Sequence, residues 1–405
     1  MQNKLHDACS KNEVEKVRDY VKKLSIDEIN HIEIETGNTA LHIATNNGHI
    51  EIIKLLLERN PFRSIRNKWN KCPFDLAPND NVRSLFKREN CFDRFCSRPG
   101  SLSAPVSPVN NDKNGDGCSL CGENDPCEWE IVDDYAVAKA VRFRQELNYS
   151  LFARNNINRD LKNKIYSINK GYLDSRLRDM HGIDSIKAYF RNASENGDPF
   201  EIVRAYSSPA VSFYKYVNGD MARNIIHDLR QGCSKFFCTR LYLAQDGVMS
   251  IASILLHHPK FAPYTFRGEV YRGMVVEKAC MEHYRPHRRI VNTTFLSTSR
   301  DRNVAKIFSY QNEVKEDQIS IFCTYEIKND RTALYIAELS EVSDEKEVLI
   351  LPFAAFTINT VGKNNDGEIH IWLEECELTQ PKSFLTIPFF KRRQSNTVLT
   401  ESIQL

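Results

Sequence analysis

Three short segments near the end of the chain combine the residue types that suit chemistry on a phosphorylated sugar. They are Tyr271–Gly273, Ser297–Ser299 and Glu345–Glu347, and each lies beside apolar, strand-like sequence. The first supplies a guanidinium, the second three hydroxyls and the third two carboxylates. Together they predict a site that grips phosphate and stabilises positive charge on a sugar while a glycosidic bond breaks.

Arg272 is the candidate phosphate ligand. It follows Glu269–Tyr271, a run typical of a β-strand, and precedes Gly273, which lets a ligand approach the backbone. Guanidinium groups bind phosphate through two parallel hydrogen bonds. An arginine on a strand also commonly pairs with a surface carboxylate, so this segment alone does not define a site.

The hydroxyls of Ser297, Thr298 and Ser299 lie in the β-prone run Phe295–Ser299. They are able to brace ligand oxygens or to tie neighbouring strands together. Ser and Thr side chains often bond to nearby backbone, so the segment by itself leaves both interpretations open.

Glu345 and Glu347 stand two residues apart, immediately before the predicted strand Val348–Leu351. In an extended chain this spacing points both carboxylates to one face, where like charges repel. The crowding is costly unless a cation or a reaction uses it. One carboxylate beneath a sugar stabilises developing positive charge, and the second is able to orient an incoming guanidinium. The alternative is a solvated acidic turn, which the other charged residues of this segment favour.

The elements around these segments change type along the chain. Amphipathic helical patterns dominate from Trp129 and are followed from about residue 268 by short β-rich runs. The helical patterns are Val137–Phe143, Met221–Leu229 and Ala252–His257, and the β-rich runs are Glu269–Tyr271, Ile319–Tyr325, Val348–Leu351 and Phe356–Ile358. Helices first and strands afterwards predict an α+β domain.

The beginning of the chain contains an internal repeat. Thr39–Ala44 is one residue away from T-P-L-H-x-A and leads into the amphipathic run Ile50–Leu57. Weaker copies begin at Leu5 and at Cys72, and the first continues through Val14, Val17 and Val21. The pattern resembles ankyrin repeats over about 90 residues, and three copies are about the minimum for a stable array.

The repeat pattern implies roles for His42 and for the array as a whole. In ankyrin repeats this histidine hydrogen-bonds backbone in neighbouring turns, so we expect a structural role for His42. The array itself is expected to bind a protein partner or to pack against the rest of the chain.

Composition limits the remaining possibilities. The chain has 405 residues, 41% of them hydrophobic and 27% charged, as in a globular protein of two or three domains. A formal net charge of +2 gives no reason to expect nucleic-acid binding driven by bulk charge. The sequence shows neither a signal peptide nor a transmembrane segment, so we expect a cytoplasmic protein without membrane attachment.

Residues 91–128 are rich in Pro, Ser, Gly, Asn and Asp, which predicts a flexible linker. Cys118, Cys121 and Cys127 are able to supply three zinc ligands, and Cys91 and Cys96 are the candidates for a fourth. The spacing is not that of a paired CxxC motif, so free thiols are the alternative, and no metal is included in the predicted site. Residues 379–405 are expected to form a mobile tail.

Taken in order, these segments resemble the arginine-specific mono-ADP-ribosyltransferases of the Arg-Ser-Glu class. Ala305–Phe308 fits the same pattern, and Ala205–Ser208 and Phe213–Asn218 resemble the helical lead-in of that family. The resemblance covers roughly residues 130–378 and implies a split β-sheet domain with a helical lead-in. We therefore expect ankyrin repeats over 1–90, a linker over 91–128, a catalytic domain over 129–378 and a tail over 379–405.

The resemblance also implies roles for individual residues. Arg272 would hold the phosphates of NAD, the backbone of Gly273 the nicotinamide amide, and Ser297 the nicotinamide ribose, with Ser299 beside them. Phe308 would pack on the nicotinamide ring or, alternatively, in the core. Glu347 would be the catalytic glutamate, and Glu345 would guide the acceptor arginine.

The implied activity is that of an NAD(P)+–protein-arginine ADP-ribosyltransferase, with NAD as the substrate and an arginine-bearing protein as the acceptor. Two alternatives remain open. In an NAD glycohydrolase, water would replace arginine, and in an inactive ankyrin scaffold the transferase domain would no longer turn over.

Overall fold

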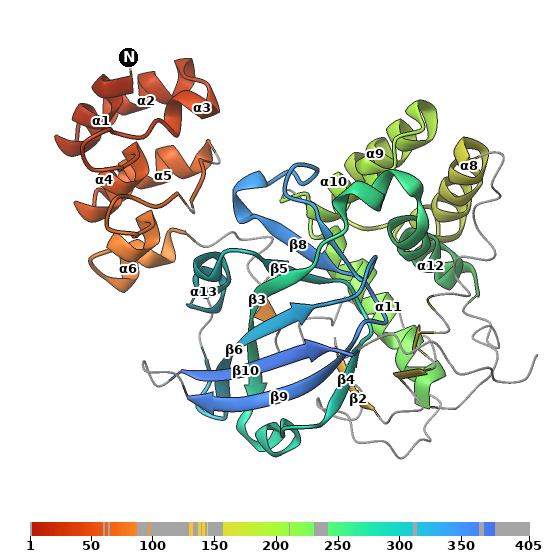
Figure 1. Cartoon of the computed structure of the whole chain (residues 1–405). Coiled ribbons are helices and arrows are strands. Elements are labelled where there is room, and N and C mark those ends of the chain that lie inside the picture. Colours follow the sequence, from red (N-terminus) through yellow and green to blue (C-terminus); the bar gives the residue numbers. More distant parts are fainter. Residues whose placement is uncertain are drawn as a thin grey trace, which may run out of the picture.

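The structure is a computed structural model in which two groups of elements are joined through α13 and the segment before β8 (Figure 1). It describes residues 2–59, 61–63, 65–86, 96–97, 129–132, 137–138, 140–141, 144, 157–209, 211–230, 242–310, 314–363 and 368–376. Most of the predicted linker, the predicted tail and the cysteines Cys91, Cys118, Cys121 and Cys127 lie outside the described residues. None of the described helices is both long and apolar enough to span a membrane.

The first group is a helical array whose members share one apolar core. Leu5, Val17, Leu41, Ile52 and Leu56 are all at most 2% exposed within it. The bounds are α1 (Gln2–Ser10), α2 (Val14–Lys23), α3 (Ile26–Ile29), α4 (Ala40–Asn46), α5 (Ile50–Glu58), the 3₁₀ turn η1 (Pro73–Leu76) and α6 (Asp80–Ser84). The helices expected in the first two copies are present.

His42 connects two copies of the repeat, in agreement with its expected structural role. Its Nδ1 accepts from the backbone N–H of Thr39 at 3.1 Å, so Nε2 carries the proton and donates to the carbonyl of Lys71 at 3.1 Å. Burial lowers the pKa of His42 to about 4.

The third copy differs from the second because its first helix is a single 3₁₀ turn. Pro73 stands at the start of this turn, and Ala77 at its end has an extended backbone with ψ 122°. Pro78 follows, and a proline disfavours helical geometry at the residue before it. The two prolines therefore limit η1 to four residues.

The second group contains a helical lobe that packs against one face of a sheet (Figure 1). Phe190, Phe213 and Phe261 from the lobe share a core with Phe295, just before β5, and with Leu349 of β8. The lobe contains α8 (Ile157–Ile168), the π turn η2 (Asn169–Leu173), α9 (Ile183–Asn196), α10 (Phe200–Ser207), α11 (Phe213–Arg230), α12 (Tyr242–His257) and the 3₁₀ turn η3 (Pro259–Tyr264).

The sheet contains ten strands among the described residues. Their bounds are β1 (Cys96–Ser97), β2 (Trp129–Val132), β3 (Gly268–Glu277), β4 (Arg289–Asn292), β5 (Leu296–Ser299), β6 (Gln318–Ile327), β7 (Ala333–Tyr335), β8 (Glu347–Ile350), β9 (Ala355–Lys363) and β10 (Ile369–Glu375). Nine follow the order β2-β4-β9-β10-β6-β3-β5-β8-β7, and β1 pairs with β3. Among the described residues from β3 to β10, the one α-helix is α13 (Arg302–Tyr310). Two 3₁₀ turns, η4 (Lys278–His283) and η5 (Ser343–Glu345), lie in the same part of the chain.

The sheet divides between β3 and β5. β3 pairs with β6 along its whole length, from Gly268 to Glu277, whereas it pairs with β5 only at Tyr271 and Ser299. This single pair joins two halves of the sheet, as the expected split β-sheet requires. All residues of β5 and β8 are buried, so the predicted site segments lie in the interior.

Candidate active site

Arg272 lies in the interior of the domain. It is 2% exposed, and its Nη1 donates to the carbonyl oxygen of Ser297 at 2.6 Å. A buried guanidinium requires hydrogen-bond acceptors to offset its desolvation. The interpretation of Arg272 as a surface ion pair is therefore wrong, and the first two predicted segments are in direct contact.

The second and third segments are neighbours in the sheet. Ser299 of β5 pairs with Tyr271 of β3 on one side and with Glu347 of β8 on the other. Directly opposite residues in antiparallel strands point to the same face. Tyr271, Ser299 and Glu347 therefore form one row across three strands, although up to 76 positions of sequence separate them (347 − 271).

The three hydroxyls of β5 have different surroundings. Thr298 Oγ1 donates to the carbonyl of Val348 at 2.6 Å, and Ser299 Oγ donates to the carbonyl of Glu345 at 2.7 Å. Both therefore tie strands and loops together. Ser297 is 2% exposed, and its Oγ has no hydrogen-bond partner among the described residues. A buried hydroxyl without a partner costs free energy, so Ser297 is the member of this set that fits a ligand contact.

The two glutamates do not sit on one extended strand. Glu345 ends the 3₁₀ turn η5, Glu347 begins β8, and Lys346 between them is left-handed with φ +47°. The expectation that this segment is extended is therefore wrong, because a left-handed residue separates the two glutamates. A left-handed residue other than glycine costs about 1–2 kcal/mol and persists only where its surroundings hold it.

Three contacts hold Lys346 in this conformation. Its backbone N–H donates to Ser343, its carbonyl accepts from the N–H of Arg300, and its Nζ lies 3.3 Å from a carboxylate oxygen of Asp301. Ser343 belongs to the same turn, whereas Arg300 and Asp301 lie about 45 residues earlier in the sequence.

The acidic segment is not solvated. Glu347 is fully buried, Glu345 is 3% exposed and Asp344 is 8% exposed. Burial of carboxylates is costly unless charges or hydrogen bonds compensate. The interpretation as a solvated acidic turn is therefore wrong, and the carboxylates belong to the buried polar site.

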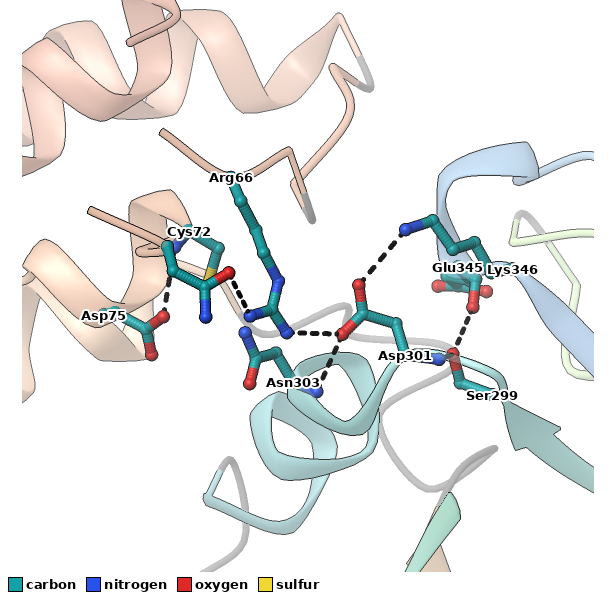
Figure 2. Close-up of polar contacts among 9 residues, drawn as sticks. Arg66, Cys72, Asp75, Ser299, Asp301, Asn303, Glu345 and Lys346 are labelled. Carbon is teal, nitrogen blue, oxygen red and sulfur yellow. Dashed lines mark hydrogen bonds and ion pairs between the residues drawn. The ribbon is translucent and has the colours of Figure 1, made fainter. Parts of the chain in front are cut away.

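Asp301 is a site residue that the sequence analysis missed. Its Oδ1 accepts from the backbone N–H of Asn303, which caps the start of α13, and both Arg66 and Lys346 bind its carboxylate (Figure 2). Burial would raise the pKa of Asp301, but the N–H of Asn303 and the two cations outweigh burial and lower it. The sequence signal for Asp301 is its position: an aspartate immediately before a helical pattern predicts a cap at the start of the helix.

The remaining predicted residues lie at the edges of this group. Phe308 is 4% exposed and packs with Val275 and Val304, which agrees with the core interpretation. Gly273 is in register with Phe322 of β6 and with Cys96 of β1.

Two residues of the helical lead-in bond to backbone near the site. Ser207 Oγ accepts from the backbone N–H of Glu341, at the start of the segment that carries the two glutamates. Asn218 Nδ2 donates to the carbonyl of Phe295, just before β5, and to the hydroxyl of Tyr206. Both lead-in segments thus position backbone next to predicted site residues.

Two family models match parts of the chain. Residues 5–92 match ankyrin repeats in three copies, and residues 271–380 match the ADP-ribosyltransferase exoenzyme family. A search of curated proteins gave no match.

Several solved ADP-ribosyltransferases are similar to parts of this chain. For Vis from Vibrio splendidus in complex with agmatine, the identity is 18%, the match covers 62% of this chain and 88% of that chain, and the TM-score is 0.29. For HopU1 of Pseudomonas syringae, the identity is 14%, the match covers 56% of this chain and 99% of that chain, and the TM-score is 0.33. For exoenzyme S from Pseudomonas aeruginosa, bound to carba-NAD, the identity is 15%, the match covers 55% of this chain and 94% of that chain, and the TM-score is 0.33.

The chain therefore combines N-terminal ankyrin repeats with an ADP-ribosyltransferase exoenzyme domain in an α+β fold. The matched family is one of ADP-ribosyltransferases, and ADP-ribosyltransferases use NAD as their substrate.

Proposed function

We propose that this chain transfers ADP-ribose from NAD to an arginine side chain of an acceptor protein and releases nicotinamide. The observation that carries the proposal is the buried Glu345–Glu347 segment, which is bonded to Ser299 of the strand that also receives Arg272. This arrangement supplies carboxylates for a developing cation and a guanidinium for phosphate within one group of side chains.

Glu347 has the catalytic role in this proposal. As the bond between ribose and nicotinamide breaks, its electron pair leaves with nicotinamide and positive charge develops on the sugar. The carboxylate of Glu347 accepts a hydrogen bond from a ribose hydroxyl and stabilises that charge. Burial of Glu347 strengthens the effect, because water screens charge less there.

Arg272, Gly273 and Ser297 bind NAD. Arg272 holds its phosphates, and the main chain of Gly273 bonds the nicotinamide amide. The hydroxyl of Ser297, which has no partner among the described residues, contacts the nicotinamide ribose. Ser299 holds the carbonyl of Glu345 and so acts on the acceptor side of the site. Phe308 contributes to NAD binding only if it leaves its contacts with the core.

Glu345 determines the acceptor. Its carboxylate accepts hydrogen bonds from the incoming guanidinium and takes the proton that the attacking nitrogen loses. This role accounts for a second carboxylate so close to Glu347.

The second candidate function is hydrolysis of NAD, in which water attacks instead of arginine. One observation favours it: Glu345 is only 3% exposed, and a water molecule reaches such a group more easily than a side chain of another protein does. Transfer to protein therefore requires that the acceptor enter beside this segment.

Incubation with labelled NAD separates the two functions. The acceptors are agmatine, which carries a guanidinium, and a protein digest analysed by mass spectrometry after modification. Transfer predicts label on agmatine and on arginine residues, in addition to released nicotinamide. Nicotinamide and free ADP-ribose without labelled acceptor would favour hydrolysis, and NAD left intact would favour an inactive scaffold.

A further inference from the structure

The ankyrin array contacts the catalytic domain at two elements that flank the site. Ile307 of α13 is 6% exposed and belongs to the apolar core of the array. Between α5 and η1, Arg63 contacts Asp344, next to Glu345, and Arg66 contacts Asp301, just before α13. The array therefore touches both the helix that carries Phe308 and the segment that carries Glu345.

Arg63 fixes the beginning of the acidic segment. Its backbone N–H donates to Asp344 Oδ2 at 2.6 Å, and its Nη1 donates to the carbonyl of Phe86 within the array at 2.7 Å. Arg63 and Asp344 are 9% and 8% exposed. A hydrogen bond from backbone to a buried carboxylate is charge-assisted and therefore strong.

Arg66 acts on the other end of the same segment. Its Nη1 donates to Asn70 Oδ1 at 2.7 Å, which orients the guanidinium within the array, and its Nη2 donates to Asp301 Oδ1 at 3.0 Å. The second oxygen of Asp301 binds Lys346 Nζ at 3.3 Å. Figure 2 shows Asp301 between these two cations, with Ser299 and Glu345 next to Lys346.

We propose that Arg66 is a positioning residue for the acceptor carboxylate, so that the ankyrin array forms part of the machinery that selects arginine. The inference rests on the proposed function. Glu345 lies between Asp344 and Lys346, and the array reaches both: Asp344 directly and Lys346 through Asp301.

The physical basis is the cost of the loop conformation. Lys346 is left-handed, and such a residue relaxes when its partners are removed. Asp301 is 6% exposed, so the loss of one of its two cations weakens the attraction that keeps it in place against Lys346. Glu347 depends less on this group because it is paired within the sheet with Ser299.

The test compares Arg66→Ala with Arg83→Ala in the full chain. Arg83 is a matched control, because it pairs with Asp80 on the surface of the same array. We expect Arg66→Ala to reduce transfer to agmatine about tenfold, the effect of losing one charge-assisted bond, and NAD hydrolysis less than twofold. Arg66→Lys keeps the charge opposite Asp301 and should restore part of the transfer, whereas Arg83→Ala should behave as wild type.

Hydrogen exchange gives a readout that does not depend on catalysis. Amides of residues 342–347 should exchange at least several-fold faster in Arg66→Ala than in wild type or Arg83→Ala, while amides of β6 remain unchanged. Unchanged exchange together with an unchanged ratio of transfer to hydrolysis would overturn the proposal. Increased transfer in Arg66→Ala would also overturn it, since the array would then obstruct the acceptor.

The two proposals fail in different ways. If wild type hydrolyses NAD but labels no guanidinium, arginine transfer is wrong, and exchange in residues 342–347 still decides whether Arg66 holds the loop. If wild type transfers to arginine and Arg66→Ala does so equally well, only the positioning role is wrong.

Discussion

Replacement of Ser299 by alanine tests how the acceptor segment is held. Ser299 is fully buried, and its Oγ donates to the carbonyl of Glu345 at 2.7 Å and accepts from the N–H of Asp301 at 2.9 Å. Alanine removes one partner from each of two buried backbone groups. At roughly 1–2 kcal/mol for each bond lost, Ser299→Ala should reduce the free energy of unfolding by about 3 kcal/mol.

Thr298→Val is the matched control for this variant. Thr298 is also fully buried, but among the described residues its hydroxyl makes one hydrogen bond, to the carbonyl of Val348 at 2.6 Å. Valine keeps the shape, so we expect a loss of about 1 kcal/mol. In thermal unfolding these values correspond to a fall of Tm by about 9 °C for Ser299→Ala and about 3 °C for Thr298→Val.

The activity assay gives the second half of the test. Because Ser299 holds the backbone of Glu345, Ser299→Ala should lower transfer to agmatine more than it lowers NAD hydrolysis, measured well below the reduced Tm. Thr298→Val should leave the ratio of the two unchanged. Equal losses of stability in both variants, or an unchanged ratio in Ser299→Ala, would refute the reasoning.

Three further predictions concern other parts of the chain. Burial lowers the pKa of His42 to about 4, whereas in the unfolded chain it protonates near 6.5; the array should therefore lose up to about 3 kcal/mol of stability as the pH falls from 6.5 to 4, and urea unfolding of His42→Gln should show a shallower pH dependence over that interval. Asn218→Asp places a carboxylate against the carbonyl of Phe295 in a site 4% exposed and should cost about 3 kcal/mol in urea unfolding, clearly more than Asn218→Ala. Phe308→Leu should cost about 1 kcal/mol with KM for NAD unchanged if Phe308 belongs to the core, and a raised KM with unchanged stability would instead support a contact with nicotinamide.

Much of the fold was predictable because it follows local patterns. Alternation and β-branched residues predicted the strands that became β3, β6, β8 and β9, and the helical period predicted α5 and parts of α11 and α12. The order of the three site segments predicted that they form one site. The sheet brings them together through the pairs Tyr271–Ser299 and Ser299–Glu347.

The geometry of the acceptor segment was not predictable in the same way. The alternation expected for Glu345 and Glu347 fails because Lys346 is left-handed, and this conformation depends on Arg300 and Asp301, about 45 residues away in sequence. The contact between Arg66 and Asp301 spans 235 positions and joins two domains, so no local pattern reveals it.

In the third ankyrin copy the sequence did contain a local signal, the two prolines around η1. The similarity to the repeat nevertheless favoured a full helix there. Pro73 and Pro78 frame η1 and restrict it to one 3₁₀ turn. The two prolines, taken alone, predict a short turn at this position instead of a helix.

The most direct test of the central claim compares Glu347→Gln and Glu345→Gln with wild type in labelled NAD and agmatine. Glutamine has nearly the size of glutamate but no charge, so it removes the electrostatic contribution with little change in shape. We expect Glu347→Gln to abolish both nicotinamide release and transfer, and Glu345→Gln to lose transfer while retaining part of the nicotinamide release. Wild-type activity in Glu347→Gln, or equal loss of both reactions in Glu345→Gln, would contradict the roles assigned to the two carboxylates.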